Sequence, residues 1–381
     1  MLKRLSILSL IILFSCSGKP NFMKFEVVFY APLGTNYNEI GSNISEIKEN
    51  CSNQTLILND YINVSTSFQI YRNRLYIADR YNKRITIFSL GEKDTNVSII
   101  PNKGEGYEFD TPVSLVLNKY GEIYVLATVT NRLSNTMTTN SELYENLFYV
   151  YKFSPSGKFI YCIGESGINS TPFGLIERID IDLFNNLYVY VVRYDGDYKN
   201  YDVKRFSISG ELTFEFDTKY IPRTNVINNE TYIRLISSIF NLKNNERLII
   251  TSQNYMIGKD GKNVDTPSTF YNSVDVYSIL RNSITKNIFK SKKHFEDVLA
   301  VTYDDVAVLY SYDERAKGIK FRFLDLSGTS EKETVYYAPQ LPSLYLNSGF
   351  FVDKNGEIYS TIVKDEKYFV IIRWKKVKSR S

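Results

Sequence analysis

The stretch NRLYIADRYNKRITIF, residues 73–88, contains two apolar segments separated by the polar run Asp-Arg-Tyr-Asn-Lys-Arg. The apolar segments are rich in Ile, Leu, Tyr and Phe, which favour β-strands, and the polar run is typical of a tight turn. The stretch therefore predicts a β-hairpin with a charged tip. This hairpin is either a single site or one copy of a repeated unit.

Segments that resemble the first half of this hairpin recur along the chain at intervals of about fifty to sixty residues. The counterparts are IYVLAT (123–128), LYVYVV (187–192), LIITS (248–252), VAVLYS (306–311) and IYSTIV (358–363). Each one follows another strand-like segment and a polar turn. The Asn, Asp and Gly residues of these turns adopt the left-handed backbone conformations that tight hairpins need.

A third strand follows in every copy, and in four copies it ends in a related turn: ITIFSLG, YKFSPSG, VKRFSISG and FRFLDLSG. A fourth, more polar strand comes next. Four antiparallel strands repeated at this interval are typical of β-propeller blades. We therefore predict an all-β fold, a six-bladed β-propeller over residues 67–376. The predicted blades span residues 67–102, 113–165, 177–217, 233–291, 297–338 and 348–376.

The sixth predicted blade has only three strands, and an unpaired sheet edge invites aggregation. Its fourth strand should therefore come from the N-terminal region, residues 25–66. We expect QTLIL (54–58) to close the ring, with FEVVFY (25–30) as the alternative. A seventh, partial blade would form if these two segments paired in a separate sheet. NEIGSNISEIKEN (38–50) is a candidate short helix between them.

Part of the opening hairpin resembles the NHL repeat, in which a strand, Ala-Asp, a turn with Asn and Arg, and a strand ending in Phe follow one another. The matching residues are Ile77, Ala78, Asp79, Asn82, Arg84, Ile85 and Phe88. This resemblance implies a binding scaffold more often than an enzyme. We expect Asp79, Asn82 and Arg84 to stabilise the turn through backbone hydrogen bonds and an ion pair, with a binding role as the alternative.

The N-terminus, MLKRLSILSLIILFSC, has two basic residues, an apolar run from Leu5 to Phe14, and Ser15 before Cys16. This order is typical of a signal peptide, and the apolar run is too short to span a bilayer. Residues 13–16 resemble the bacterial lipobox, which implies cleavage after residue 15 and lipidation of Cys16. Residues 16–24 would then be a tether. A plain secreted protein is the alternative.

Acyl chains on Cys16 would hold the protein on a membrane, at the periplasmic face of the outer membrane or at the cell surface. Loss of Lys3 and Arg4 with the leader would lower the formal net charge of +4 by two charges. A nearly neutral chain does not indicate a nucleic-acid partner, and residues 377–381 form only a short basic tail. We expect Cys51 and Cys162 to be free thiols, with a disulfide as the alternative.

The sequence lacks the usual signatures of enzymes. The only histidine, His294, cannot form a multi-histidine metal site, and three cysteines, one of them lipidated, do not make a zinc cluster. A glycine-rich phosphate loop and a Gly-x-Ser-x-Gly motif are both missing. We therefore predict a non-catalytic binding protein without a cofactor or a metal. An envelope-assembly factor in the periplasm and a metal-dependent propeller hydrolase are the alternatives.

The connections between the second and third strands are long in three adjacent predicted blades, over residues 129–146, 194–200 and 255–271. Equivalent connections of a propeller emerge on one face, so we expect this face to bind a protein or a small ligand. Neutral surface insertions are the alternative. The candidate contact residues are Tyr144, Tyr194, Asp195, Asp197, Tyr198, Tyr255, Asp260 and Tyr271. The aspartates there are expected to form hairpin turns rather than a calcium site.

Overall fold

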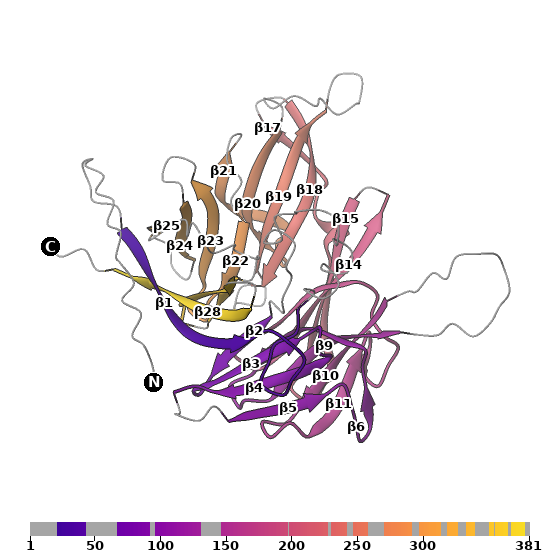
Figure 1. The fold of residues 1–381 in the computed structure, drawn as a ribbon. Coiled ribbons are helices and arrows are strands. Elements are labelled where there is room, and N and C mark those ends of the chain that lie inside the picture. Colours follow the sequence, from indigo (N-terminus) through magenta and orange to yellow (C-terminus); the bar gives the residue numbers. More distant parts are fainter. Residues whose placement is uncertain are drawn as a thin grey trace, which may run out of the picture.

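The computed structural model describes residues 21–42, 67–91, 96–130, 146–196, 198–227, 230–241, 247–257, 270–291, 297–313, 318–326, 333–339, 350–353, 355–364 and 367–377. Within these ranges the fold is all-β, as predicted, and the one helical element is the short 3-10 helix η2 (Thr218–Tyr220). Most strands belong to antiparallel sheets of four or five strands (Figure 1).

The first three sheets follow one another along the chain and largely coincide with the predicted blades, but the second sheet runs from residue 111 to residue 168, beyond the predicted 113–165, and the third begins at residue 176. The first sheet contains β2 (Phe68–Tyr71), β3 (Arg74–Asp79), β4 (Arg84–Ser89) and β5 (Val97–Pro101). The second contains β8 (Thr111–Leu117), β9 (Ile123–Thr130), β10 (Asn146–Phe153), β11 (Phe159–Gly164) and the short β12 (Gly167–Ile168). The third contains β13 (Ile176–Ile181), β14 (Leu187–Asp195), β15 (Tyr198–Phe206) and β16 (Leu212–Asp217). A separate small ribbon pairs β6 (Lys103–Gly104) with β7 (Tyr107–Glu108).

The fourth sheet has an additional edge strand that the sequence did not predict. It contains β17 (Thr224–Ile227), β18 (Glu230–Asn241), β19 (Arg247–Met256), β20 (Phe270–Ser278) and β21 (Ser283–Ser291). The fifth contains β22 (Asp297–Val301), β23 (Val306–Asp313), β24 (Gly318–Asp325) and β25 (Glu333–Pro339). The sixth contains β26 (Phe350–Val352), β27 (Ile358–Lys364) and β28 (Tyr368–Lys376), with β1 (Asn21–Pro32) beside β28; because β1 also pairs with β25, the fifth and sixth sheets join into one sheet of eight strands.

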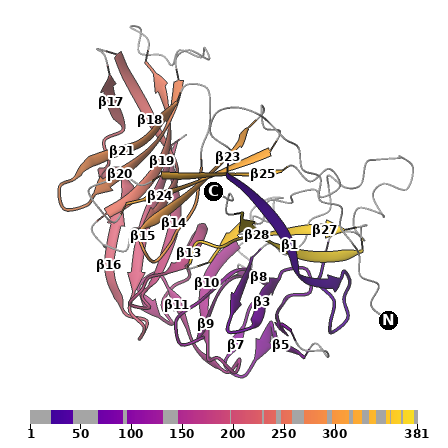
Figure 2. The same ribbon diagram turned by 90° about the vertical axis from the view of Figure 1, so that its left-hand side faces the viewer.

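Strand β1 supplies the fourth strand of the sixth sheet. It pairs antiparallel with β28, from Met23 opposite Lys376 to Pro32 opposite Tyr368, and its first two residues pair with β25 in parallel. Figures 1 and 2 show the indigo β1 lying against the yellow β28. The alternative segment, residues 25–30, is therefore the one that pairs here, and our first choice was wrong. Residues 54–58 lie outside the described residues, as does most of the candidate helix.

A β-bulge explains how β1 packs against two neighbouring sheets. The register with β28 shifts between Val27 and Phe29, and one extra residue reverses which face the following side chains occupy. Before the bulge, Met23 and Phe25 pack with the fifth and sixth sheets. After it, Phe29 and Ala31 pack with the first and sixth sheets. One strand thus contributes to two cores, and it belongs to no separate, seventh sheet.

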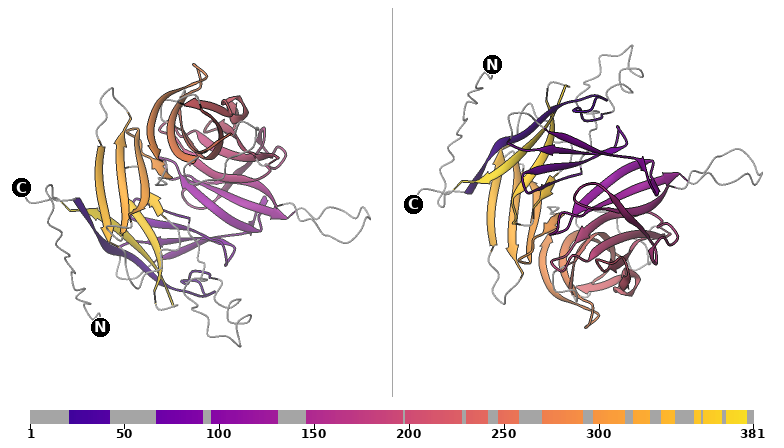
Figure 3. Two further views of the ribbon diagram at one scale, coloured as in Figure 1. Left: turned by 90° about the horizontal axis from the view of Figure 1, so that it is seen from above. Right: turned by 90° about the horizontal axis from the view of Figure 1, so that it is seen from below.

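Each hydrophobic cluster lies between two consecutive sheets. Clusters join the first sheet to the second, the second to the third, the third to the fourth, the fourth to the fifth, and the fifth to the sixth. A further cluster, which includes Phe29, Phe68, Ile77 and Phe369, joins the sixth sheet back to the first. In the views of Figure 3 the sheets accordingly follow one another in chain order, and the last strands lie beside the first.

The first strands of the sheets face one another in the middle of the molecule. Strand β8 lies beside both β2 and β13, and β22 lies beside both β18 and β26. Burial raises the pKa of Tyr303, which follows β22, and the nearby carboxylates Asp180 and Asp182 of the third sheet and Tyr71 of the first raise it further. Residues of the first, third and fifth sheets therefore approach one another at the centre.

The hairpin turns repeat one hydrogen-bond pattern, as the sequence predicted. Asn118, Asp182, Thr302 and Asp353 each accept backbone N–H groups from the residues two and four positions later, at 2.8–3.3 Å. The residue three positions later has a positive φ in every case: Gly121, Asn185, Asp305 and Gly356. A side-chain acceptor together with a left-handed residue fixes the register of each hairpin.

The opening hairpin buries its charge among partners from the same chain. The carboxylate of Asp79 is fully buried and accepts hydrogen bonds from Gly41 N (2.9 Å), Asn82 Nδ2 (2.9 Å), Arg84 Nε (3.1 Å) and Thr86 Oγ1 (3.3 Å). The guanidinium of Arg84 also donates to the carbonyl oxygens of Asn36 and Glu39, both at 2.7 Å. The predicted structural role is confirmed, and the contacts also fix the segment that follows β1.

Candidate functional site

The tips of the third and fourth sheets form the most distinctive polar region of the structure. Strands β14 and β15 stay paired to their ends, with Tyr194 opposite Lys199 and Asp195 opposite Tyr198. The predicted loop at 194–200 is therefore a continuous hairpin, because Gly196 adopts a positive φ of 59° and permits a tight turn. Beside it, β17, β18 and β19 project at the top of Figures 1 and 2.

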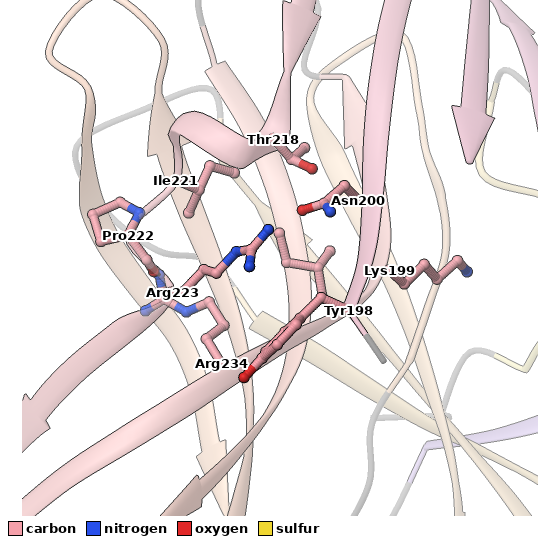
Figure 4. A pocket seen from close by; sticks show the side chains of 9 residues that line it. Tyr198, Lys199, Asn200, Thr218, Ile221, Pro222, Arg223 and Arg234 are labelled. Carbon is pink, nitrogen blue, oxygen red and sulfur yellow. The ribbon is translucent and has the colours of Figure 1, made fainter. Parts of the chain in front are cut away.

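A small cavity lies where this hairpin meets the fourth sheet (Figure 4). We call it the hairpin pocket, and its lining residues are Tyr198, Lys199, Asn200, Thr218, Ile221, Pro222, Arg223, Arg234 and Ile236. Its volume of about 10 Å³ matches one water molecule. Pockets that enclose whole ligands are many times larger, so this one could hold a single chemical group.

Arg234 is the most unusual residue of the hairpin pocket. Its side chain lies on β18 and is only 5% exposed, yet Nε has no hydrogen-bond partner among the described residues. The only hydrogen bond that the guanidinium makes to the described residues is a long one, 3.4 Å from Nη1 to the carbonyl oxygen of Pro222. No described carboxylate lies within ion-pair distance of Arg234. An arginine stays protonated under these conditions, so its charge is buried without compensation.

The other two cations of the hairpin pocket already have partners. Arg223 Nη2 donates to Asp195 Oδ2 at 2.7 Å, and its guanidinium lies 4.6 Å from the centre of the Tyr198 ring. Lys199 forms an ion pair with Glu177, which also accepts a hydrogen bond from Tyr201 at 2.7 Å. Figure 4 shows the Lys199 side chain extending away from the other labelled residues. Arg234 is therefore the cation left for an outside anion.

A buried polar group lies next to Arg234 on the same face of the fourth sheet. Asn254, directly opposite Arg234 in the pairing of β18 and β19, is completely buried. Its amide nitrogen donates to Ser273 Oγ at 3.1 Å, but Oδ1 has no hydrogen-bond partner among the described residues. Asn254 Oδ1 is thus an acceptor without a described donor, and Arg234 on the neighbouring strand has a donor, Nε, without a described acceptor. Buried groups of this kind are uncommon in folded proteins.

The predicted contact residues differ in their exposure and in their hydrogen-bond partners. Tyr194 is 65% exposed, Tyr198 lines the hairpin pocket, and Asp195 pairs with Arg223. Tyr255 lies on β19 and donates to Gln253 Oε1 at 2.8 Å. Tyr271 was a wrong choice, because it is only 2% exposed and packs against the Tyr232 ring. Four predicted site residues lie outside the described residues: Cys16, Tyr144, Asp197 and Asp260.

The sequence analysis missed Arg234, although a signal was present. Alternate residues of β18 are buried, and Tyr232, Arg234 and Ile236 occupy the same face. A charged residue in phase with buried apolar neighbours is expected to be buried too, because successive side chains of a strand point to opposite faces. Reading that alternation along residues 230–241 would have identified Arg234 as an unusual buried cation.

A second cavity, of about 250 Å³, lies between the fifth and sixth sheets. The ammonium group of Lys376 lines it and lies 3.9 Å from the centre of the Phe323 ring. Burial lowers the pKa of Lys376. Here the cation has aromatic partners from the same chain, Phe323 and Tyr336, and Asp304 also lines the cavity. The hairpin pocket is the stronger candidate because Arg234 Nε has no hydrogen-bond partner, and Arg234 no acidic partner, among the described residues.

The described ranges of residues also bear on three other features: a metal site, reactive cysteines and a membrane-spanning helix. Groups of three or more His, Cys, Asp or Glu side chains that could hold a metal ion do not occur there. Cys162 is a free thiol, and its Sγ lies 3.1 Å from Asn169 Oδ1, whereas Cys51 lies outside these ranges. None of the described helices is long and apolar enough to cross a membrane.

No protein-family model and no curated protein matches the chain. Among solved structures, it is similar to the polysaccharide lyase Uly1, with 6% identity, a TM-score of 0.45, and coverage of 92% of this chain and 99% of that one. It is also similar to Kuenenia stuttgartiensis hydrazine synthase, with 11% identity, a TM-score of 0.44, and coverage of 82% and 96%. A Dyadobacter fermentans protein of unknown function has 11% identity, a TM-score of 0.40, and coverage of 82% and 94%. Likeness at this level supports no conclusion about chemistry.

Proposed function

We propose that the mature chain is a lipid-anchored extracytoplasmic protein that binds a protein or a small ligand without catalysing a reaction. The observation that supports this proposal best is the hairpin pocket, in which the buried Arg234 has no acidic partner among the described residues and only one long hydrogen bond to them. The pocket lies at the tips of the third and fourth sheets, and strands hold both of its walls in place. Polar groups without partners on a rigid hairpin are well placed to bind a partner molecule, because the scaffold holds them in position.

The scaffold in this proposal is a closed, six-bladed β-propeller. Its support comes from the succession of hydrophobic clusters, which passes from each sheet to the next and returns from the sixth to the first. The bulges of β8, β13, β18 and β22 lie at corresponding places in their sheets, as repeated units require. Strand β1 would close the ring by covering the edge of β28.

The membrane anchor in this proposal is Cys16, in its lipobox-like context. Strand β1 begins at Asn21, five residues later. An extended chain spans at most about 3.5 Å per residue, so the start of β1 would lie within roughly 20 Å of the lipid. The propeller would therefore sit close to the membrane, with little freedom to diffuse away from it.

An envelope-assembly role is a second candidate, and one feature of the fourth sheet favours it. Strand β17 pairs only with β18, so its outer edge has no strand partner in the described structure. Val226 on this strand is exposed. A partner could add a strand to such an edge through main-chain hydrogen bonds. Both candidate functions use the same end of the molecule and the same anchor.

Lipidation is tested by intact-mass measurement and membrane fractionation of the natural protein and of Cys16→Ala. We expect the natural protein to carry the mass of acyl groups and to sediment with membranes, and we expect Cys16→Ala to lose both properties. A natural protein without the mass of acyl groups would contradict the proposed membrane anchor at Cys16.

The binding end is tested by placing a photo-crosslinking residue at Tyr194 and, in a matched control, at Tyr120. Both tyrosines are exposed, but Tyr120 lies in the β8–β9 turn, whose Lys119 contacts Asn185 at the opposite end of β14. We expect crosslinked products in cells from position 194 and few from position 120. Equal yields at both positions, or products only from position 120, would contradict a binding role for the hairpin end.

A further inference from the structure

Arg234 poses a specific problem of charge. Arg234 as a whole is only 5% exposed, and the one hydrogen bond that its guanidinium donates within the described residues is the 3.4 Å contact to the carbonyl oxygen of Pro222. Removing an ion from water costs several kcal/mol unless a counter-charge or strong hydrogen bonds replace the solvent. Because arginine does not lose its proton, the structure requires an anion or a water molecule beside Arg234.

The acidic side chains around the hairpin pocket are already engaged. Asp195 pairs with Arg223, and Glu177 pairs with Lys199 and Tyr201. Asp275, in the same sheet as Arg234, accepts hydrogen bonds from Ser273 Oγ at 2.9 Å and Asn287 Nδ2 at 2.6 Å. None of these described carboxylates is therefore available as a counter-ion for Arg234.

We propose that the hairpin pocket binds one oxyanionic group of a ligand, a carboxylate or a phosphate, with Arg234 as the main contact. This inference rests on the proposed function and names the ligand class. The planar guanidinium donates in a fork that matches these anions. Arg223, whose charge is already paired with Asp195, and the hydroxyl of Tyr198 also lie at the pocket and would add further donors.

The size of the pocket limits what enters it. A volume of about 10 Å³ has room for about one water-sized group, so one oxygen atom of the carboxylate or phosphate would enter it and the rest of the ligand would lie on the surface outside. Exposed apolar side chains lie on the elements around the opening: Tyr194 on β14, Tyr220 in η2 and Val226 on β17. The proposed ligand is therefore an acid with an apolar or aromatic portion.

The test measures the binding of inorganic phosphate and of acetate to the mature, lipidated protein in detergent, by calorimetry and by the thermal unfolding midpoint. Chloride keeps the ionic strength constant. The variants are Arg234→Gln, Arg234→Lys and the matched control Arg281→Gln, in which an exposed arginine of the β20–β21 turn is replaced. We expect the natural protein and Arg281→Gln to bind at least one anion and to unfold at a higher temperature in its presence.

We expect Arg234→Gln to bind at least about tenfold more weakly, because it loses a charge-assisted bidentate contact. It should also be at least as stable as the natural protein without anion, since replacing an uncompensated buried charge is often neutral or stabilising. Arg234→Lys should bind with intermediate affinity, because it keeps the charge but not the fork. If Arg234→Gln does not fold, Arg234→Lys alone still gives the comparison with Arg281→Gln.

Three results would overturn the anion site: no binding of either anion, equal binding by Arg234→Gln, or a loss of stability in Arg234→Gln without any anion dependence. The last result would indicate that a buried water molecule, and not an anion, occupies the pocket. Stronger binding of acetate than of phosphate would indicate that the natural ligand carries a carboxylate. Stronger binding of phosphate would indicate that it carries a phosphoryl group. These outcomes are independent of crosslinking at Tyr194, so the anion site can fail while the proposed binding function stands.

Discussion

The hairpin tip of the first sheet and the hairpin pocket of the third and fourth sheets both bury charge, but they compensate it differently. In the first sheet, Asp79 receives four hydrogen-bond donors, including Arg84, within its own chain. In the hairpin pocket, Arg234 is also buried, at 5% exposure, and its guanidinium has one long hydrogen bond to a carbonyl oxygen among the described residues. The first arrangement stabilises the fold, and the second leaves a cation for a ligand.

This difference shows how a charged residue can be assigned to structure or to binding. Both residues lie on strands that pack against a neighbouring sheet, and both are polar exceptions in an apolar pattern. What separates them is the number of partners that the chain itself provides. Replacing a buried charge that has a complete set of partners lowers the stability of the fold. Replacing a buried charge that lacks partners is expected to change the affinity for a ligand more than the stability.

The largest effect is expected from Asp79→Asn. This change removes the carboxylate that pairs with Arg84 and leaves a nearly buried guanidinium without its counter-charge. Breaking a buried pair on one side costs about 3–5 kcal/mol, so the free energy of unfolding should fall by about that amount. Urea or guanidinium denaturation measures it.

The matched control for this prediction is Glu108→Gln, which breaks the ion pair with Lys103. Both of these side chains are largely exposed, at 63% and 70%, and such a pair contributes at most about 1 kcal/mol. If Asp79→Asn were no more destabilising than Glu108→Gln, the opening hairpin would not have the structural role described above.

A smaller effect is expected from Asp195→Asn, and it should appear in affinity rather than stability. Asp195 is mostly exposed and competes with any bound anion for Arg223. Removing its charge should change stability by less than about 1 kcal/mol and should raise the affinity for phosphate or acetate roughly twofold to fivefold. Calorimetric titration measures this change, and a weaker affinity would place Arg223 outside the anion site.

The smallest effect concerns acid stability at the first hairpin. Hydrogen bonds from Asn36, and the charge of Arg84 to a lesser degree, lower the pKa of Glu39 below 4.5. A carboxyl group with a lowered pKa stabilises the fold above its unfolded pKa, and this contribution is lost as the pH falls through its folded pKa. Glu39→Gln should therefore flatten the fall of the unfolding temperature between about pH 5 and about pH 3.

The control for this pH series is Glu105→Gln, in the exposed turn between β6 and β7. We expect its unfolding temperature to follow that of the natural protein across the same range. A pH profile of Glu39→Gln identical to the natural one would mean that the contacts around Arg84 do not depend on Glu39.

Several features could be predicted from the sequence because they depend on neighbours in the chain. The polar turns at Asn118, Asp182 and Asp353 require only a side-chain acceptor and a residue with a positive φ three positions later. The continuous hairpin at 194–200 was misread as a loop, because its polar residues hid strands that remain paired to the tip.

The sequence by itself determined the repeated strands, their turns and the all-β class, since these follow from local alternation and local hydrogen bonds. Tertiary structure decided which N-terminal segment lies on β28, because the sequences of residues 25–30 and 54–58 are both apolar and typical of strands, and the packing of residues 23–31 against two sheets became visible only in the fold. It also decided that Arg234 would be buried without an acidic partner among the described residues. That outcome depends on groups from β15, η2 and β18, which only the folded chain brings together.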